Sequence, residues 1–251
     1  MIRFRYSIVA GVVVFALAVG PGILPASAAP RESEPSIQAI ANRLRVHATT
    51  IAELRAAAEQ AEEIMATIRD VNTLMRPMIP GLRKIAESRA LKSLGELPYV
   101  GVPAKTVRVS ADLLEALARG LIALEELDLR TAQKLRRSIF ATDRFLRTES
   151  RVDLAELVAS YDSAIPVLDE TVKANDRAVA QIDAAQRILD RVARMKSLIE
   201  PRNAELAKSV DELRTALTEL RRAIVSANRG LRSIVAFMQE ISRDGHTVLG
   251  R

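Results

Sequence analysis

The stretch VDELRTALTELRRAI, residues 210–224, decides the fold. Its apolar residues recur in alternating steps of three and four, and this spacing places them on one side of an α-helix. The same pattern continues on both sides of the stretch without a polar interruption. It predicts a helix-packing seam that must be buried against other helices. The members of this seam are Leu206, Val210, Leu213, Leu217, Leu220, Ile224, Leu231, Ile234, Met238 and Ile241.

Residues 37–75 carry a second seam with the same spacing, which begins at Ile37 and ends at Met75. Two polar residues, His47 and Asn72, interrupt it. We expect this helix to stop near Arg76, because Pro77 and Pro80 follow and proline lacks the amide hydrogen that a helix interior needs.

A third helical pattern covers residues 152–200, and Pro166 should bend it. Ser150 and Asp153 stand three residues apart just before its apolar run, as in a capping box at a helix N-terminus. Glu200-Pro201 marks a tight turn or a kink before the final helix. Gly245 predicts that the final helix ends near residues 244–245.

The segment between these helices is less regular. Leucines from 113 to 127 form an apolar stripe, but the stripe changes phase near Asp128, which predicts a kink or a stutter in the packing. Residues 97–109, LPYVGVPAKTVRV, contain two prolines and a glycine. This stretch could form a loop or a small hairpin with an apolar tip at one end of the helices, although a connector that caps the core is the simpler interpretation. We expect helix to resume near Ala104 or Ser110.

Together these patterns predict an all-α protein with three to four long helices in an elongated, up-down, coiled-coil-like bundle. The bundle should cover residues 37–245, with a polar leader at 29–36 and a tail at 246–251. Short connections favour antiparallel neighbours in one chain. An intermolecular coiled coil remains the alternative partner for the 206–241 seam.

The N-terminus has the layout of a secretory signal peptide. Arg3 and Arg5 precede an uncharged apolar core at residues 8–19, Pro21-Gly22 breaks it, and Ala26-Ser-Ala28 offers small residues for cleavage. We expect cleavage after Ala28, with a retained membrane anchor as the alternative. The predicted location is outside the cytoplasm, in the periplasm, the cell envelope or the medium.

Composition excludes several kinds of chemistry. The chain contains no cysteine, so it has no disulfide, thiolate metal site or cysteine nucleophile. Loss of residues 1–28 would remove two arginines and no acid, which lowers the formal net charge from +6 to +4. Such a mildly basic exported chain gives no reason to expect a nucleic acid partner.

We also find no pattern of residues that would make the chain an enzyme. The two histidines, His47 and His246, lie far apart in the sequence, and no glycine-rich phosphate loop or metal-binding pair is present. Carboxylates such as Glu62 and Glu63 diverge from neighbouring helix positions. We therefore expect no catalytic residues, no cofactor and no bound metal.

One segment, residues 130–151, could form a surface for a membrane or a partner. On a helical wheel its basic residues lie opposite an apolar stripe that Phe140 and Phe145 flank, as in helices that lie on anionic lipid. A solvated arginine-rich helix face is the simpler interpretation. The candidate surface residues, including those of the 97–109 tip, are Arg130, Lys134, Arg137, Phe140, Arg144, Phe145, Arg151, Tyr99, Val100 and Val102.

The sequence thus leads to three hypotheses. The first is a non-enzymatic structural or interaction protein of the cell envelope or periplasm, which presents long helical faces to a protein partner or to itself. The second is a protein that binds anionic membranes through residues 130–151 and the 97–109 tip. The third and weakest is a ligand-sensing bundle built around Asn72, Asn175 and Gln186, although a small-molecule ligand is not expected.

Overall fold

The computed structural model describes residues 36–86, 103–194 and 204–250. Residues 35–251 form one compact unit. The prediction of an all-α helical bundle is confirmed: four long helices and one short helix make up the described chain. They are α1 (Ile37–Val46), α2 (Ala48–Ala86), α4 (Pro103–Thr148), α5 (Arg151–Arg194) and α7 (Ala204–Leu249).

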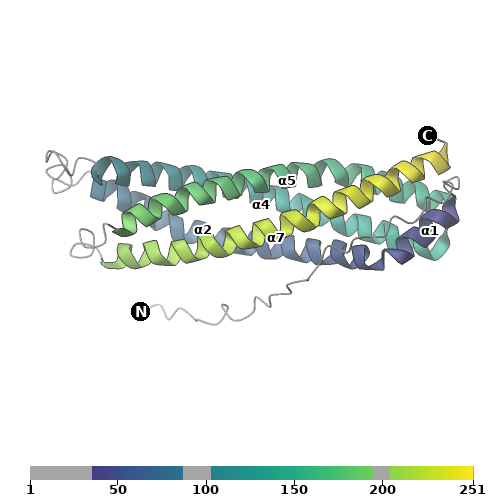
Figure 1. Ribbon diagram of the computed structural model, residues 1–251, viewed down its shortest axis with the longest axis horizontal. Coiled ribbons are helices and arrows are strands. Elements are labelled where there is room, and N and C mark those ends of the chain that lie inside the picture. Colours follow the sequence, from purple (N-terminus) through teal and green to yellow (C-terminus); the bar gives the residue numbers. More distant parts are fainter. Residues whose placement is uncertain (1–35, 87–102, 195–203, 251) are drawn as a thin grey trace, which may run out of the picture. The chain divides into compact units, whose positions relative to one another are not determined.

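The four long helices run antiparallel to their neighbours along the chain (Figure 1). α2 packs against α4, α4 against α5, α5 against α7, and α7 closes the ring on α2. At about 1.5 Å per residue, helices of this length extend roughly 60–70 Å. The short helix α1 lies at the end of the bundle where α4 and α7 finish (Figure 1).

The 206–241 seam lies in the interior of the bundle. Its members from Val210 to Ile241 are all buried, while the side chain of Leu206 lies outside the described part. The core positions of α2, α4 and α5 follow the same alternation of three and four residues. Each helix therefore keeps one side toward the bundle axis along its whole length.

The predicted phase change in α4 is wrong. Core positions continue in unbroken three-four steps from Leu124 through Asp128 and Thr131 to Leu135, and then through Ser138 and Thr142 to Phe145. The apolar residues shift to another stripe because polar residues occupy several core positions, while the core positions themselves do not shift. The buried polar members of this seam are Asp128, Thr131, Ser138 and Thr142.

The predicted bounds of the first long helix also need correction. It is broken at His47, which ends α1 and lies exposed with its ring 5.6 Å from the ring of Phe237. α2 then continues through Pro77 and Pro80 as far as Ala86. Both prolines face solvent, so water can bind the carbonyls that they leave free while the core side of the helix stays packed.

The start of α5 and the end of α7 can each be traced to a single residue. Ser150 caps α5 as predicted, since its Oγ accepts a hydrogen bond of 3.1 Å from the Asp153 amide. The predicted end of the last helix at Gly245 is wrong, because α7 continues to Leu249. Gly245 is instead a buried core position beside Val158, and Gly250 takes the left-handed conformation that follows the helix.

Polar pairs at seven-residue intervals fix the register of α5 against α7. Aspartates recur at every seventh position of α5, from Asp162 to Asp190. Asp183 accepts a hydrogen bond of 2.6 Å from Arg221, and Asp176 pairs with Arg232 at 2.8 Å. Residue numbers of the partners on α7 decrease as those of the aspartates on α5 increase, as expected for antiparallel helices. Only one antiparallel register of α5 against α7 allows these pairs to form together.

A second row of ion pairs connects α2 to α4. Arg55 pairs with Asp143, Glu62 with Arg136, and Arg83 with Glu115. No described hydrogen bond or ion pair joins α2 to α7. The ring of four helices is therefore closed at that interface by apolar contacts alone, as far as the described residues show.

Two glycines of α7 provide a test of the packing. In Gly245→Ala the new Cβ would overlap Val158 Cγ2, so we expect a loss of about 1–3 kcal/mol in the free energy of unfolding. Gly230→Ala on the same helix meets no atom within 4 Å and should gain about 0.5–1 kcal/mol from helix propensity. Urea unfolding measures both values, and equal effects of the two substitutions would contradict this packing.

Candidate functional site

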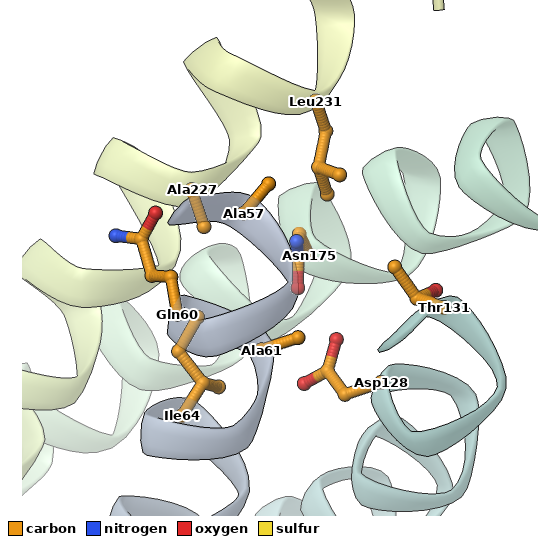
Figure 2. A pocket seen from close by; sticks show the side chains of 9 residues that line it. All are labelled: Ala57, Gln60, Ala61, Ile64, Asp128, Thr131, Asn175, Ala227 and Leu231. Carbon is orange, nitrogen blue, oxygen red and sulfur yellow. The ribbon is translucent and has the colours of Figure 1, made fainter. Parts of the chain in front are cut away.

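The most unusual feature of the interior is a small cavity among the four long helices, seen from close by in Figure 2. Its volume is about 10 Å³, close to the smallest space that holds one water molecule. All four long helices contribute to its wall. The lining residues are Ala57, Gln60, Ala61, Ile64, Asp128, Thr131, Asn175, Ala227 and Leu231.

The cavity belongs to a polar layer that divides the apolar core. One apolar cluster includes residues 64–82 of α2 and 210–227 of α7. The other includes residues 54–58 of α2 and 231–241 of α7, together with buried residues of α1. On α4 and α5 the gap between the clusters is filled by polar side chains, namely Asp128, Thr131, Thr171 and Asn175.

A chain of hydrogen bonds fixes the two amides of this layer. Nδ2 of Asn228 donates to Asp176 Oδ1 at 2.7 Å and to the Val172 carbonyl at 3.3 Å, so its oxygen must face Asn175. Nδ2 of Asn175 donates to that oxygen at 3.3 Å. The oxygen of Asn175 is consequently left on the cavity side, where it has no partner.

The threonines on the other side of the cavity have no hydrogen to spare. Thr171 donates its hydroxyl hydrogen to the Val167 carbonyl at 2.9 Å. In the 2.7 Å bond between Thr131 and Thr171, the donor must therefore be Thr131. Both hydroxyl hydrogens are used away from Asp128.

Asp128 is the one acid of this layer whose side chain faces the cavity without an ion pair. Its residue is only 2% exposed, and its Oδ2 has no hydrogen-bond partner. Burial raises the pKa of Asp128 from 3.8 to about 7, because the surrounding protein solvates a carboxylate poorly. At neutral pH this side chain therefore exists as a mixture of the acid and the carboxylate.

The sequence contains only partial signals for this layer. Asn175 stands out as an amide on an apolar seam, and Asp128 marks the place where the leucine stripe is interrupted. Asn72, by contrast, is half-buried and does not line the cavity. Gln186 lies further along α5, where it donates a 2.8 Å hydrogen bond to Thr218 of α7. A strict count in steps of three and four along α4 would have found Asp128.

The structure changes the composition of the basic surface predicted at residues 130–151. Phe145 is fully buried, because it occupies a core position of α4, so its place on that surface is wrong. Arg144 is engaged by Asp153 at 2.8 Å and Glu156 at 2.9 Å. Arg151 donates to the Leu249 carbonyl. The residues that remain without a described ion pair are Arg130, Lys134, Arg137 and Arg147, and Phe140 is exposed among them.

The predicted apolar tip lies mostly outside the described residues, including Tyr99, Val100 and Val102. Residues 103–109 belong to the first two turns of α4, with Pro103 in its first turn, where proline is well tolerated. This part of the stretch is helix, which agrees with the predicted return to helix near Ala104.

The outward face of α4 carries an exposed apolar stripe that the sequence did not single out. Ile122 is 47% exposed, Leu129 is 50% exposed and Phe140 is 66% exposed. Spacings of seven and eleven residues place these three side chains within about 20° of one another around the helix. They lie on the side of α4 that no other described helix covers.

Within the described ranges, no group of three or more acids and histidines could hold a metal ion, and no helix is long and apolar enough to cross a membrane. His246 contacts Asp162 at 2.8 Å near the end of α7, far along the chain from His47. No known protein family, curated protein or solved structure matches the chain.

The amide chain can be tested by a double-mutant cycle. Asn228→Leu leaves the Asn175 amide without its partner, while Asp176 keeps Arg232, and we expect it to cost about 1–3 kcal/mol of unfolding free energy. Asn175→Leu on its own should cost a similar amount. The double variant should lose less than the two losses combined, by about 0.5–3 kcal/mol, because no amide is then left unpaired.

The half-buried pair Gln186 and Thr218 gives a control on the same helices. Gln186→Ala should cost less than about 1 kcal/mol, since water can replace the lost partner. Strict additivity of the two asparagine substitutions in urea unfolding would contradict the described chain of bonds.

Proposed function

We propose that the protein is a non-enzymatic interaction protein that acts outside the cytoplasm, and that the outward face of α4 is its contact surface. One observation carries the proposal: Ile122, Leu129 and Phe140 form a single exposed stripe on a helix whose opposite side is fully packed. Apolar side chains that recur along one exposed face of a helix are the kind of seam against which a second helix can pack. The export follows from the signal-peptide layout of residues 1–28.

The order of charges along this face supports a second copy of the chain as the first partner to test. Suppose that the α4 helices of two copies pair antiparallel through their outward faces, with the two-fold axis at the level of residue 131. Each charged residue along the face of one copy then meets a residue of opposite charge on the other copy. Parallel pairing would place like charges together. In the antiparallel arrangement Glu115 meets Arg147, Arg119 meets Asp143, Glu126 meets Arg136, and Ile122 meets Phe140.

Several of these charges already have a partner within the bundle. Arg136 pairs with Glu62, and Asp143 pairs with Arg55. In a dimer these charged residues would therefore mainly select the register of the two α4 helices, while burial of the apolar side chains would supply most of the affinity. An axis shifted by half a heptad along the helix would place Glu126 against Asp143 or Arg119 against Arg136, which disfavours the neighbouring registers.

Because the chain has no cysteine, the register can be tested by disulfide trapping. A mixture of I122C and F140C proteins should form a cross-linked dimer under mild oxidation, since these positions face each other. Either variant alone should form little cross-linked dimer, because in this register the two copies of residue 122 would lie about 27 Å apart. V225C, an exposed position on α7, serves as the control for random collisions.

The result is checked by sedimentation equilibrium of the wild type. Concentration-dependent dimers that Phe140→Asp abolishes would support self-association through α4. Cross-linking of I122C to itself, or a strictly monomeric wild type at about 0.1 mM, would contradict it.

The second candidate function is binding to anionic membranes. Arg130, Arg137 and Arg147 have no described ion pair, and Phe140 is exposed beside them. Each such cation near an anionic surface can contribute about 1 kcal/mol. The cavity of about 10 Å³ beside Asn175 is far too small for an organic ligand, whereas Gln186, also named in the third hypothesis, lines an open groove of about 540 Å³ between α5 and α7.

Vesicle co-sedimentation separates the two candidates. The wild type is compared with a variant in which Arg130, Arg137 and Arg147 are all replaced by glutamine, so that any binding by residues 1–35 is common to both. For an interaction protein we expect equal pelleting with anionic vesicles at low salt. Pelleting of the wild type alone, abolished by high salt, would favour the membrane function.

A further inference from the structure

The cavity beside Asp128 presents acceptors and no donor. Oδ2 of Asp128 and Oδ1 of Asn175 are buried oxygens without a partner. Figure 2 shows that Asn175 turns its oxygen toward the Asp128 carboxylate, while the Gln60 amide points away from the cavity. Two acceptors that face each other in a dry core repel unless something between them supplies a hydrogen or a positive charge.

Rotation of the Asn175 amide would not relieve this arrangement. Its nitrogen would then face Asp128, but its oxygen would face Oδ1 of Asn228. Asn228 cannot turn to compensate, because its nitrogen is held by Asp176 Oδ1 at 2.7 Å and by the Val172 carbonyl. The unpartnered oxygens are therefore a consequence of the whole hydrogen-bond chain from α5 to α7.

Three occupants could supply what is missing. A water molecule has room and two hydrogens, but it would leave the buried carboxylate charge uncompensated. A hard metal ion such as Ca²⁺ or Mg²⁺ collects six or more oxygen ligands, and only Asp128 and Asn175 offer unpartnered oxygens here. A proton needs no space, removes the charge and supplies the donor.

We propose that the cavity is a proton-binding site in which Asp128 takes up one proton and donates it in a hydrogen bond to Asn175 Oδ1. Protonation would complete one continuous chain from Asp128 on α4 through Asn175 on α5 to Asn228 on α7. Loss of the proton leaves two acceptors opposed at the level where the two apolar clusters meet. This inference goes beyond the proposed function and does not rest on it.

The surroundings of Asp128 contain no charge that could take the place of the proton. α2 presents Ala57, Ala61, Ile64 and the uncharged Gln60 to the cavity, α5 presents Asn175, and α7 presents Ala227 and Leu231. Asp176, next to Asn175, is occupied by Arg232 and Asn228. The raised pKa of Asp128 agrees with this geometry, since burial without a counter-charge is its only cause.

The sign of the pH dependence follows directly. The folded chain holds the proton up to about pH 7, whereas the unfolded chain loses it near pH 3.8. Between these two pH values the folding equilibrium constant increases about tenfold for each pH unit by which the pH falls. Above pH 7 this contribution is lost and the curve becomes flat.

The test measures urea unfolding of the full chain from pH 4.5 to pH 8.5 for the wild type, Asp128→Asn and Asp169→Asn. Asparagine at 128 imitates the protonated acid, because its amide can donate to Asn175. We expect the ratio of the folding equilibrium constants, wild type over Asp128→Asn, to fall on the order of a hundredfold as the pH rises from 4.5 to 7. Relative to Asp169→Asn, a change at a half-buried position of α5 that does not line the cavity, that decline should be absent.

Two results would overturn the proposal. The first is a ratio between wild type and Asp128→Asn that does not change with pH. The second is stabilisation of the wild type at pH 8 by sodium chloride but not by tetramethylammonium chloride at equal ionic strength, which would mean that a metal cation fills the cavity. If Asp128→Asn does not fold, Asp128→Ser gives the same comparison.

Discussion

A helix of about forty residues can keep one side toward its neighbours only if its core positions alternate in steps of three and four. All four long helices of this protein obey that constraint, including α4, where polar residues occupy several core positions. The burial of the apolar seams, the placement of the polar layer and the outward position of the α4 stripe all follow from it. Phe145 is buried and Phe140 is exposed for this one reason.

The spacing explains why the helices pack, and the polar pairs explain why they pack in one register. Apolar seams of equal spacing could slide by a heptad with little loss, whereas the aspartates of α5 have matching partners at Arg221, Asn228 and Arg232 in one alignment only. Exposed ion pairs add little stability. Their effect, together with that of the buried amides, is to exclude the alternatives.

The helical class and the seam of α7 could be predicted from the sequence because apolar residues fill almost every core position there. Prediction failed where local chemistry and core position disagree. Pro77 and Pro80 do not end α2, because packing of its buried side outweighs the missing hydrogen bonds. Gly245 does not end α7, because the close approach of α5 requires a residue without a side chain there. Asp128 was not placed in the core, because its charge indicates a solvent-facing residue while its position, counted in steps of three and four, belongs to the core seam of α4.

Asp128 lies at a core position, away from water and without a counter-charge among the described residues. This placement can be measured through the carbon-13 chemical shift of its carboxyl group, followed across pH in the full chain and assigned with Asp128→Asn. We expect a titration midpoint of about 7. A midpoint near the ordinary value of 3.8 would mean that water reaches the carboxylate, and it would contradict both the closed polar layer and the continuous seam of α4.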